Sequence, residues 1–318
     1  MTTSDVFTLG EAMTVLYADD SAPLPTAERF TRSVAGAESN VATGLVRLGH
    51  TASWVGRVGD DPLGHHILSQ LRGEGVDVSG AVTDPGAPTG LLLRDCHGER
   101  PIQVLYYRSG SAGSRLCPAD LDHDQIAGAR ILHVTGITVA LSPTARAATE
   151  QAIETARANG VLVSLDPNLR RKLWADDAQA AEALARLAAS ADLVLSGLDE
   201  AQLITGQTDE DAIAAWFFDH GAQTVVVKAG ADGASGTDGA DWVRAPGLPV
   251  TTVDPVGAGD AFAAGFLSAW LDGGSLGPCV RKGALAGALA VQYPGDVAGL
   301  PRPADIAASE DSSNDVDR

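Results

Sequence analysis

The sequence predicts an α/β protein in which helices cover both faces of a mostly parallel central sheet, with a small β lid projecting from it. Short apolar runs alternate with helical patterns over most of the 318 residues, as in repeated strand–helix units. The alternation breaks between 89 and 108, where two strand-like runs follow one another without a helix between them. Such a hairpin does not fit a parallel sheet and indicates a separate antiparallel element.

The alternating elements can be placed in chain order. The predicted strands are short and mostly apolar, and they lie at 6–9, 52–55, 131–134, 161–165, 192–195, 224–228 and 249–253. The pairs Asp61-Pro62 and Ser142-Pro143 each combine an N-capping residue with a proline at the first helical position, which indicates a helix start. The run 161–165 is apolar throughout, as expected of a strand buried on both faces.

The lid hairpin consists of runs at 89–94 and 102–108, joined by a turn at 96–99. We expect the lid to comprise roughly 13–33 and 88–110, within one folded domain over 1–302. The tail over 303–318 is polar and acidic, and the sequence predicts that it is disordered.

Composition excludes several classes of protein. Acidic residues exceed basic ones by 41 − 22 = 19, which argues against nucleic acid or an anionic membrane as partner. No apolar run approaches the roughly 20 residues of a membrane span, and the first residues do not resemble a signal peptide. The 3 cysteines follow no zinc or redox spacing, so we expect a reduced, cytoplasmic protein.

The most informative stretch is Asp254–Asp260, with the sequence Asp-Pro-Val-Gly-Ala-Gly-Asp. We expect it to connect the strand at 249–253 to a helix, because Phe262, Phe266 and Trp270 recur every four residues. The stretch lacks the Lys-Ser/Thr ending of a Walker A loop, and Phe262 replaces the third glycine of a dinucleotide-binding fingerprint.

The predicted chemistry of this stretch is phosphoryl transfer. Unpaired N–H groups of Gly257, Ala258 and Gly259 at a helix N-terminus would form an anion hole. Asp260, in the first helical turn beside them, is placed to accept a hydroxyl proton while phosphate is transferred. An ordinary N-capping aspartate after a glycine-rich loop would explain the same residues.

Polar residues elsewhere follow predicted strands at the edge where open α/β sheets bind ligands. Three consecutive cations at 170–172 stand out in so acidic a chain and favour a binding role. Tyr106 and Arg108 share one face of a lid strand, where they could face a cleft or be solvated at an edge. Glu200 is placed either to hold a water of a magnesium shell or simply to face solvent.

Nearly the whole chain resembles the ribokinase-like (PfkB) carbohydrate kinases. Gly36–Ala42 resembles their Gly-Gly-Ala-x-x-Asn-Val-Ala segment, Gly56–Gly64 their second N-terminal block, and Asp254–Asp260 their C-terminal Asp-Thr-x-Gly-Ala-Gly-Asp motif. The resemblance implies a ribokinase-like three-layer fold, with ATP and Mg²⁺ as cofactors. Pro255 replaces the usual threonine, so dependence on a monovalent cation stays open.

Within the family, Ala35–Glu38, Tyr106–Ala112 and Asp166–Arg170 are similar to 2-keto-3-deoxygluconate (KDG) kinases. The similarity implies that Asp260 is the base and that the sugar acid contacts Gly36, Ala37, Asn40, Leu92, Tyr106, Arg108, Ile137, Arg170, Asp260 and Asp296. It places ATP along Asn168, Arg170, Lys228, Gly230, Asp232, Gly233, Gly257, Ala258 and Gly259, with magnesium held through water by Glu200. Leu92 stands where these kinases often have a tyrosine, and Gly197 where relatives often have asparagine.

These features predict a kinase that transfers the ATP γ-phosphoryl group to a primary hydroxyl of a sugar acid, converting KDG to its 6-phosphate. A sugar acid offers a carboxylate to Arg108 and Arg170, whereas a neutral sugar does not. A fructokinase or other neutral-sugar kinase is the alternative on the same scaffold, and a non-catalytic sugar-binding regulator is the alternative from another class. A homo-oligomer could form if the lid strand pairs across a dimer.

Overall fold

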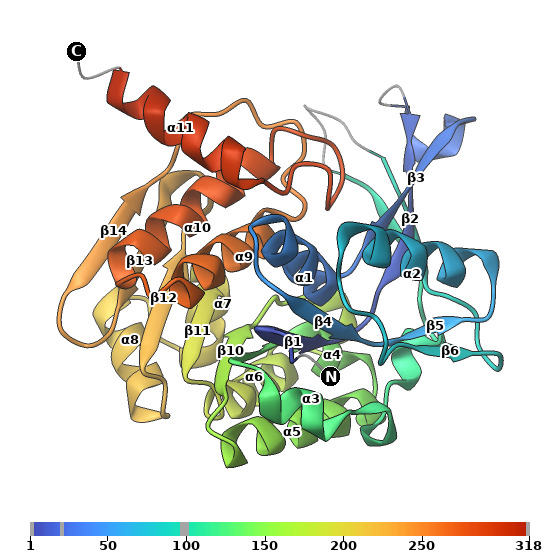
Figure 1. Cartoon of the computed structure of the whole chain (residues 1–318), viewed down its shortest axis with the longest axis horizontal. Coiled ribbons are helices and arrows are strands. Elements are labelled where there is room, and N and C mark those ends of the chain that lie inside the picture. The colour runs from blue at the N-terminus through green and yellow to red at the C-terminus, as the bar shows by residue number, and fades with distance from the viewer. Residues whose placement is uncertain (1–2, 20–21, 96–101, 316–318) are drawn as a thin grey trace.

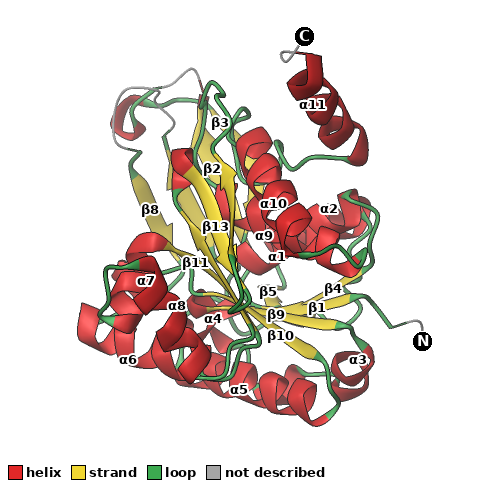
Figure 2. Cartoon of the chain, turned by 90° about the vertical axis from the view of Figure 1, so that its left-hand side faces the viewer, coloured by secondary structure: helices red, strands yellow, loops and turns green. Residues whose placement is uncertain are grey.

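The computed structural model describes residues 3–19, 22–95 and 102–315, and the structural statements below refer to them. The predicted lid turn at 96–99 lies outside the described residues. A larger sheet lies between two layers of helices, and a smaller sheet projects beside it (Figures 1 and 2).

Within the described residues, the larger sheet has eight strands in the order β14-β13-β12-β11-β10-β9-β1-β4. From β12 to β4 all neighbours are parallel, and β13 and β14 add an antiparallel edge. The strands are β1 (Val6–Leu9), β4 (Ala52–Val55), β9 (Ile131–Thr135), β10 (Leu162–Asp166), β11 (Leu193–Gly197), β12 (Thr224–Lys228), β13 (Gly233–Thr237) and β14 (Trp242–Pro246). The mostly parallel central sheet predicted from the sequence is confirmed.

Helices bury both faces of this sheet in two separate hydrophobic cores (Figure 2). One layer contains α1 (Ala37–Arg47), α2 (Pro62–Glu74), α9 (Ala258–Leu271) and α10 (Leu276–Ala290). The other contains α3 (His123–Gly128), α4 (Gly136–Leu141), α5 (Pro143–Ala158), α6 (Asp177–Ala188), α7 (Leu198–Thr205) and α8 (Glu210–Asp219). In the part of the chain that the structure describes, no helix is long and apolar enough to cross a membrane.

Local capping explains the predicted helix starts. The Asp61 side chain accepts backbone N–H bonds from Leu63 and Gly64 at 3.0 and 2.8 Å, so it caps α2. The Ser142 hydroxyl accepts the N–H of Ala145 at 3.1 Å and caps α5. Both predicted starts are confirmed.

Helix α9 is buried on nearly all sides rather than on the single face that its aromatic spacing predicts. Phe262, Phe266 and Trp270 stack along one side, while small residues on the other sides let neighbouring helices approach. A Cβ on Gly265 would lie only 2.7 Å from the Cβ of Ala286 in α10, so this glycine permits the close contact. This packing fixes the position of the N-terminus of α9.

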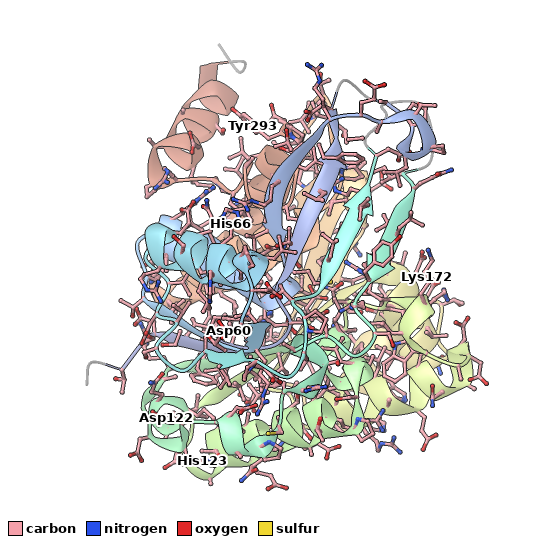
Figure 3. All side chains as sticks on the ribbon, turned by 90° about the vertical axis from the view of Figure 1, so that its right-hand side faces the viewer. Asp60, His66, Asp122, His123, Lys172 and Tyr293 are labelled. Carbon is pink, nitrogen blue, oxygen red and sulfur yellow. The ribbon has the colours of Figure 1, made fainter. Side chains whose placement is uncertain are left out.

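The lid is a four-stranded sheet in the order β3-β2-β7-β8, shown from the side in Figure 3. Its strands are β2 (Met13–Ala18), β3 (Phe30–Ala35), β7 (Leu91–Arg94) and β8 (Val104–Tyr107). The outer pairs are antiparallel as predicted, but β2 and β7 are parallel. The expectation of an antiparallel lid is therefore wrong at its centre, because β2 and β7 both leave the body of the molecule in the same direction. A separate short pair, β5 (Arg57–Gly59) and β6 (Val82–Asp84), lies beside α2.

Two predicted segments differ in the structure. Residues 249–253 are not a strand: Val253 and Asp254 donate their N–H groups to the carbonyl of Val291, and 251–253 are exposed. The end of this segment is therefore held by the C-terminal end of α10, and the segment does not add a strand to the outer edge of β14.

The tail also differs from its prediction, because Pro303–Asp315 forms helix α11. Ile306 is buried, and the Asp305 side chain accepts the N–H of Arg302 at 2.8 Å at the start of the helix. An apolar contact and a capped first turn therefore stabilise residues that look disordered by composition alone, and the prediction of disorder is wrong for them.

Candidate active site

A cavity of about 260 Å³ lies between the lid and the carboxyl ends of the parallel strands. All the residues predicted for the sugar site line it: Gly36, Ala37, Asn40, Leu92, Tyr106, Arg108, Ile137, Arg170, Asp260 and Asp296. Sequence reasoning missed six further lining residues: Glu11, Met13, Ala35, Arg94, Val104 and Val256. Two of them could have been predicted from their positions in the sequence: Glu11 follows the end of β1, and Arg94 lies on the same face of a strand as Leu92.

The residues Gly257, Ala258 and Gly259 form a turn at the start of α9, called the glycine turn below, and its Gly257 lines the cavity. Gly257 is the N-cap residue and has φ 81°, in the left-handed region that favours glycine. A Cβ here would lie 2.8 Å from the carbonyl oxygen of Asp296, so backbone packing also requires glycine. The amides of Ala258 and Gly259 lie in the first turn of α9, where N–H groups have no partner within the helix.

Asp260 is buried in this first turn and is held by two amide side chains. Its Oδ2 accepts a hydrogen bond from Asn40 Nδ2 at 2.7 Å, and its Oδ1 accepts one from Asn168 Nδ2 at 3.3 Å. Burial raises the pKa of Asp260 to about 7, with a further contribution from nearby Asp166, although the Asn40 hydrogen bond acts in the opposite direction. A carboxyl with this pKa suits a general base near neutral pH.

Asn168 reaches Asp260 from an unusual backbone conformation. Its φ is 41°, in the left-handed region, and its N–H donates to Asp166 Oδ1 at 3.1 Å. Asparagine tolerates this conformation better than most residues. The loop after β10 thus places the Asn168 side chain on Asp260, although the sequence predicted a contact with ATP.

Tyr106 in β8 and Arg108 directly after this strand line the cavity, so the solvated-edge alternative does not describe Arg108. The Arg108 side chain is only 12% exposed and forms an ion pair with buried Glu11, while its Cζ lies 5.4 Å from the centre of the Tyr106 ring. Ser111 donates its hydroxyl to Glu11 at 2.9 Å. Burial raises the pKa of Glu11, although Arg108 opposes this shift.

Asp296 and Arg170 complete the polar lining. Burial raises the pKa of Asp296 to about 6, although Arg94 and Arg170 oppose the shift. Arg170 is exposed and lines the cavity, and its charge opposes the raised pKa of Asp260 as well as that of Asp296. It can therefore meet either a sugar carboxylate or a phosphate.

The predicted nucleotide residues lie beyond the glycine turn, at the ends of β10 and β12. Lys228 Nζ forms an ion pair with Asp166 Oδ2 at 2.6 Å, and it lies 3.7 Å from where a Cβ on Gly259 would be. Burial opposes the charged form of Lys228, but Asp166 and Glu200 raise its pKa overall. A fixed cation thus faces the same space as the anion hole, as a polyphosphate requires.

The other predicted ATP residues form the turn after Lys228. Gly230–Asp232 is a short 3-10 helix with exposed side chains, leading into Gly233. Gly233 has φ 98°, and a Cβ there would lie 2.1 Å from the carbonyl oxygen of Ala245. This glycine is therefore required by packing against β14, whatever ligand the turn binds.

Glu200 has two backbone partners: its Oε1 accepts the N–H of Leu169 at 2.7 Å and its Oε2 accepts the N–H of Gly197 at 2.8 Å. It thereby joins the loop after β10 to the start of α7, close to Lys228. Among the described residues, no three His, Cys, Asp or Glu side chains form a ready-made metal cage. These residues fit magnesium only if waters and phosphate oxygens supply most of its ligands, which is how magnesium is usually held.

The chain is similar to known carbohydrate kinases over most of its length. The model of the pfkB family carbohydrate kinases matches residues 3–303. A 2-dehydro-3-deoxygluconokinase from Bacillus subtilis (strain 168) is 42% identical over 299 residues, covering 93% of this chain and 92% of the relative. One from Thermoproteus tenax is 38% identical over 299 residues, covering 93% and 90%.

A solved structure agrees with these relatives. A protein from E. coli, provisionally named ribokinase II and in complex with ATP and Mg²⁺, is 25% identical with a TM-score of 0.91, covering 97% of this chain and 99% of its own. The predicted ribokinase-like fold is therefore confirmed. The chain belongs to the pfkB family and is a carbohydrate kinase.

Proposed function

We propose that this kinase phosphorylates KDG at its primary hydroxyl, with ATP as donor and Mg²⁺ as cofactor. The observation that carries the proposal is the cavity, whose lining combines Arg94, Arg108 and Arg170 with Asp260. Such a site suits a ligand with a carboxylate at one end and a reacting hydroxyl at the other. The two relatives named as 2-dehydro-3-deoxygluconokinases, which act on the same compound, support this choice.

In the proposed mechanism, Arg108 and Arg170 bind the sugar carboxylate and so direct the opposite end of the molecule to Asp260. Asp260 accepts the proton of the primary hydroxyl, whose oxygen attacks the γ-phosphorus of ATP in line with the departing ADP. The N–H groups at Gly257, Ala258 and Gly259 stabilise the charge on the transferring group. The lid covers the cavity and excludes water that would otherwise hydrolyse ATP.

ATP would lie along the glycine turn, Asn168, Lys228 and the Gly230–Gly233 turn, with Arg170 at the junction with the sugar. Magnesium, when bound, neutralises phosphate charge, and Glu200 would orient one of its waters. The Lys228 charge next to Gly259 supports the phosphate position.

A neutral-sugar kinase is the second candidate, and Leu92 is the observation that favours it. Leu92 lines the cavity with an apolar side chain where KDG kinases often carry a tyrosine, so one polar contact to a sugar acid is absent at this position. A non-catalytic regulator fits less well, because Asp260 and its anion hole are intact.

The deciding experiment measures ADP release with Mg²⁺-ATP and each of KDG, its galactonate epimer, gluconate, fructose, ribose and no sugar. Turnover confined to the keto-deoxy acids supports the proposal. Turnover with fructose or ribose instead would keep the kinase and overturn the substrate. Sugar binding without turnover would support the regulator.

We also propose that two copies pair through the lid and that the kinase works in the cytoplasm, where ATP is available. Strand β8 is at the edge of the lid sheet, and its Leu105 and Tyr107 are 49% and 61% exposed. An exposed edge strand with large apolar side chains is a ready surface for strand pairing. Light scattering of the purified protein, compared with Leu105→Lys, tests this, and a wild-type monomer would contradict it.

A further inference from the structure

A buried ion pair connects the lid to the glycine turn. Arg94 is the last residue of lid strand β7, and its side chain is 2% exposed. Its Nη2 lies 2.6 Å from Oδ2 of Asp254, whose side chain is fully buried. These residues are 160 positions apart in the sequence, and Asp254 opens the stretch that ends in the base, Asp260.

The same carboxylate also accepts two backbone N–H groups, each directly before a residue that lines the cavity. Asp254 Oδ1 accepts the N–H of Val256 at 3.1 Å, directly before Gly257, and Oδ2 accepts the N–H of Gly295 at 2.8 Å, directly before Asp296. Asp254 is thus the shared contact of the lid, the glycine turn and the loop that carries Asp296.

Stability alone gives little reason for this arrangement. A buried ion pair is often replaceable by apolar residues without loss of stability, since removing both charges from water costs as much as their attraction returns. The pairs formed by Arg47 and Arg57 elsewhere keep the arginine side chains 11% and 20% exposed. The most direct use of a fully buried pair here is to fix geometry at the reacting end of the cavity.

We propose that Arg94 is a positioning residue: through Asp254, it couples the position of the lid to the orientation of the backbone N–H groups of Gly257–Gly259. The proposal rests on phosphoryl transfer at Asp260 but not on which sugar is the acceptor. When β7 is in place, Arg94 holds Asp254, Asp254 holds Val256, and the following amides face the transferring group. When the lid strand shifts, the carboxylate loses its cation and the turn loses its anchor.

The kinetic test compares Arg94→Met, Asp254→Asn and the double variant with wild type, using whichever sugar the wild type accepts. Because small misplacement of catalytic groups can cost up to about 100-fold, we expect Arg94→Met to lower kcat by about 10- to 100-fold. KM for ATP should change less than kcat, because the displaced amides face the transferring group, whereas Lys228 and the Gly230–Gly233 turn still hold the rest of the nucleotide. Arg94→Lys, which keeps the charge, should recover part of the lost kcat.

Coupling predicts that the double variant is no worse than the poorer single variant, because both remove one connection. Multiplied losses would mean that the two residues act independently and would overturn the proposal. Arg57→Met is the matched control: it breaks a partly buried pair with Asp120 outside the cavity, so it should lower the melting temperature and leave kcat unchanged. An equal loss of kcat in this control would reduce Arg94 to a stability role.

A second measurement does not depend on activity. Hydrogen–deuterium exchange of the peptide over 254–260 should be faster in Arg94→Met than in wild type, and unchanged in Arg57→Met. Unchanged exchange in Arg94→Met would overturn the coupling even if no sugar in the panel is phosphorylated. Conversely, a fast-exchanging Arg94→Met beside an inactive wild type would keep the coupling and reject only the proposed function.

Discussion

The central sheet and the lid sheet are built from opposite patterns of burial. Strands β1, β4 and β9 are buried along their whole length between two helical layers, so nearly all their side chains serve packing. The lid has a small core of Met13, Val15, Ala35 and Leu92, and its edge strand β8 is largely exposed. Many lid side chains are therefore not needed for core packing and can line the cavity, whereas most side chains of these central strands are needed for packing.

This difference in burial suggests different roles for the central sheet and the lid sheet. In the proposed mechanism, residues at the carboxyl ends of the central strands and at the start of α9 carry the reaction, and they lie on a sheet buried between two helical layers. In the same mechanism, residues of the lid contact the sugar, and they lie on a sheet with a small core, for which local opening should cost less free energy. Substitutions should accordingly divide into those that abolish turnover or fold, and those that change affinity.

The largest effect is expected at the end fixed to the central body. Asp260→Asn removes the base and should lower kcat by about 10²- to 10⁴-fold while leaving ATP binding intact. Its melting temperature at pH 8 should be equal or higher, because burial disfavours the carboxylate that the substitution removes. Steady-state kinetics, nucleotide titration and thermal unfolding together check this, and near-normal turnover would remove Asp260 from its role.

Truncation of a buried side chain should reduce the free energy of unfolding more in the body of the molecule than in the lid. Phe266 is fully buried in α9, and Phe266→Ala should reduce the free energy of unfolding by about 3–5 kcal/mol. Leu92→Ala in the lid should cost less, about 2 kcal/mol, because the small lid core can collapse around the gap. Urea unfolding of both variants measures the difference, and equal losses would show that the lid is as rigid as the body.

Arg108→Ala tests the lid as the affinity-determining part. A lost charge-assisted contact is worth about 1.5–3 kcal/mol, so KM for the sugar acid should rise by about 10- to 100-fold, with little change in KM for ATP. Arg171→Ala is the control, because Arg171 pairs with exposed Asp177 and does not line the cavity. A parallel rise in both KM values would contradict the assignment of Arg108 to the sugar.

Much of the central sheet and of the sugar site could be predicted from the sequence, because both depend on local sequence patterns. Apolar runs identified the central strands, caps identified the helix starts, and the resemblance marked sugar-site residues that all line one cavity. The strand expected at 249–253 is absent because Val253 and Asp254 donate their N–H groups to Val291 at the end of α10 rather than to a strand, a contact between distant segments. Helix α11 was missed because tertiary contact at Ile306 outweighs a polar composition.

The partnerships inside the site could not be predicted in the same way. The pairing of Glu11 with Arg108, and of Arg94 with Asp254, depends on where the lid comes to rest against α9. Local spacing contains no information on such contacts between distant segments. The sequence thus predicted which residues gather at the site, while the ion pairs that orient them emerged only from the folded arrangement.

The smallest expected effect is a pH dependence that distinguishes the buried base from the lid arginines. Because the pKa of Asp260 is raised to about 7 and the base must be ionised, kcat/KM should rise with pH and level off above 7. Below 7, each pH unit should lower it about tenfold. Arginines stay charged throughout this range, so Arg108→Ala should keep the same profile at a lower level. Asn40→Ala removes the hydrogen bond that lowers the pKa of Asp260, so the pH at which kcat/KM is half its maximum should rise. If this pH is the same in Asn40→Ala and wild type, another group, such as Asp296, sets the pH dependence.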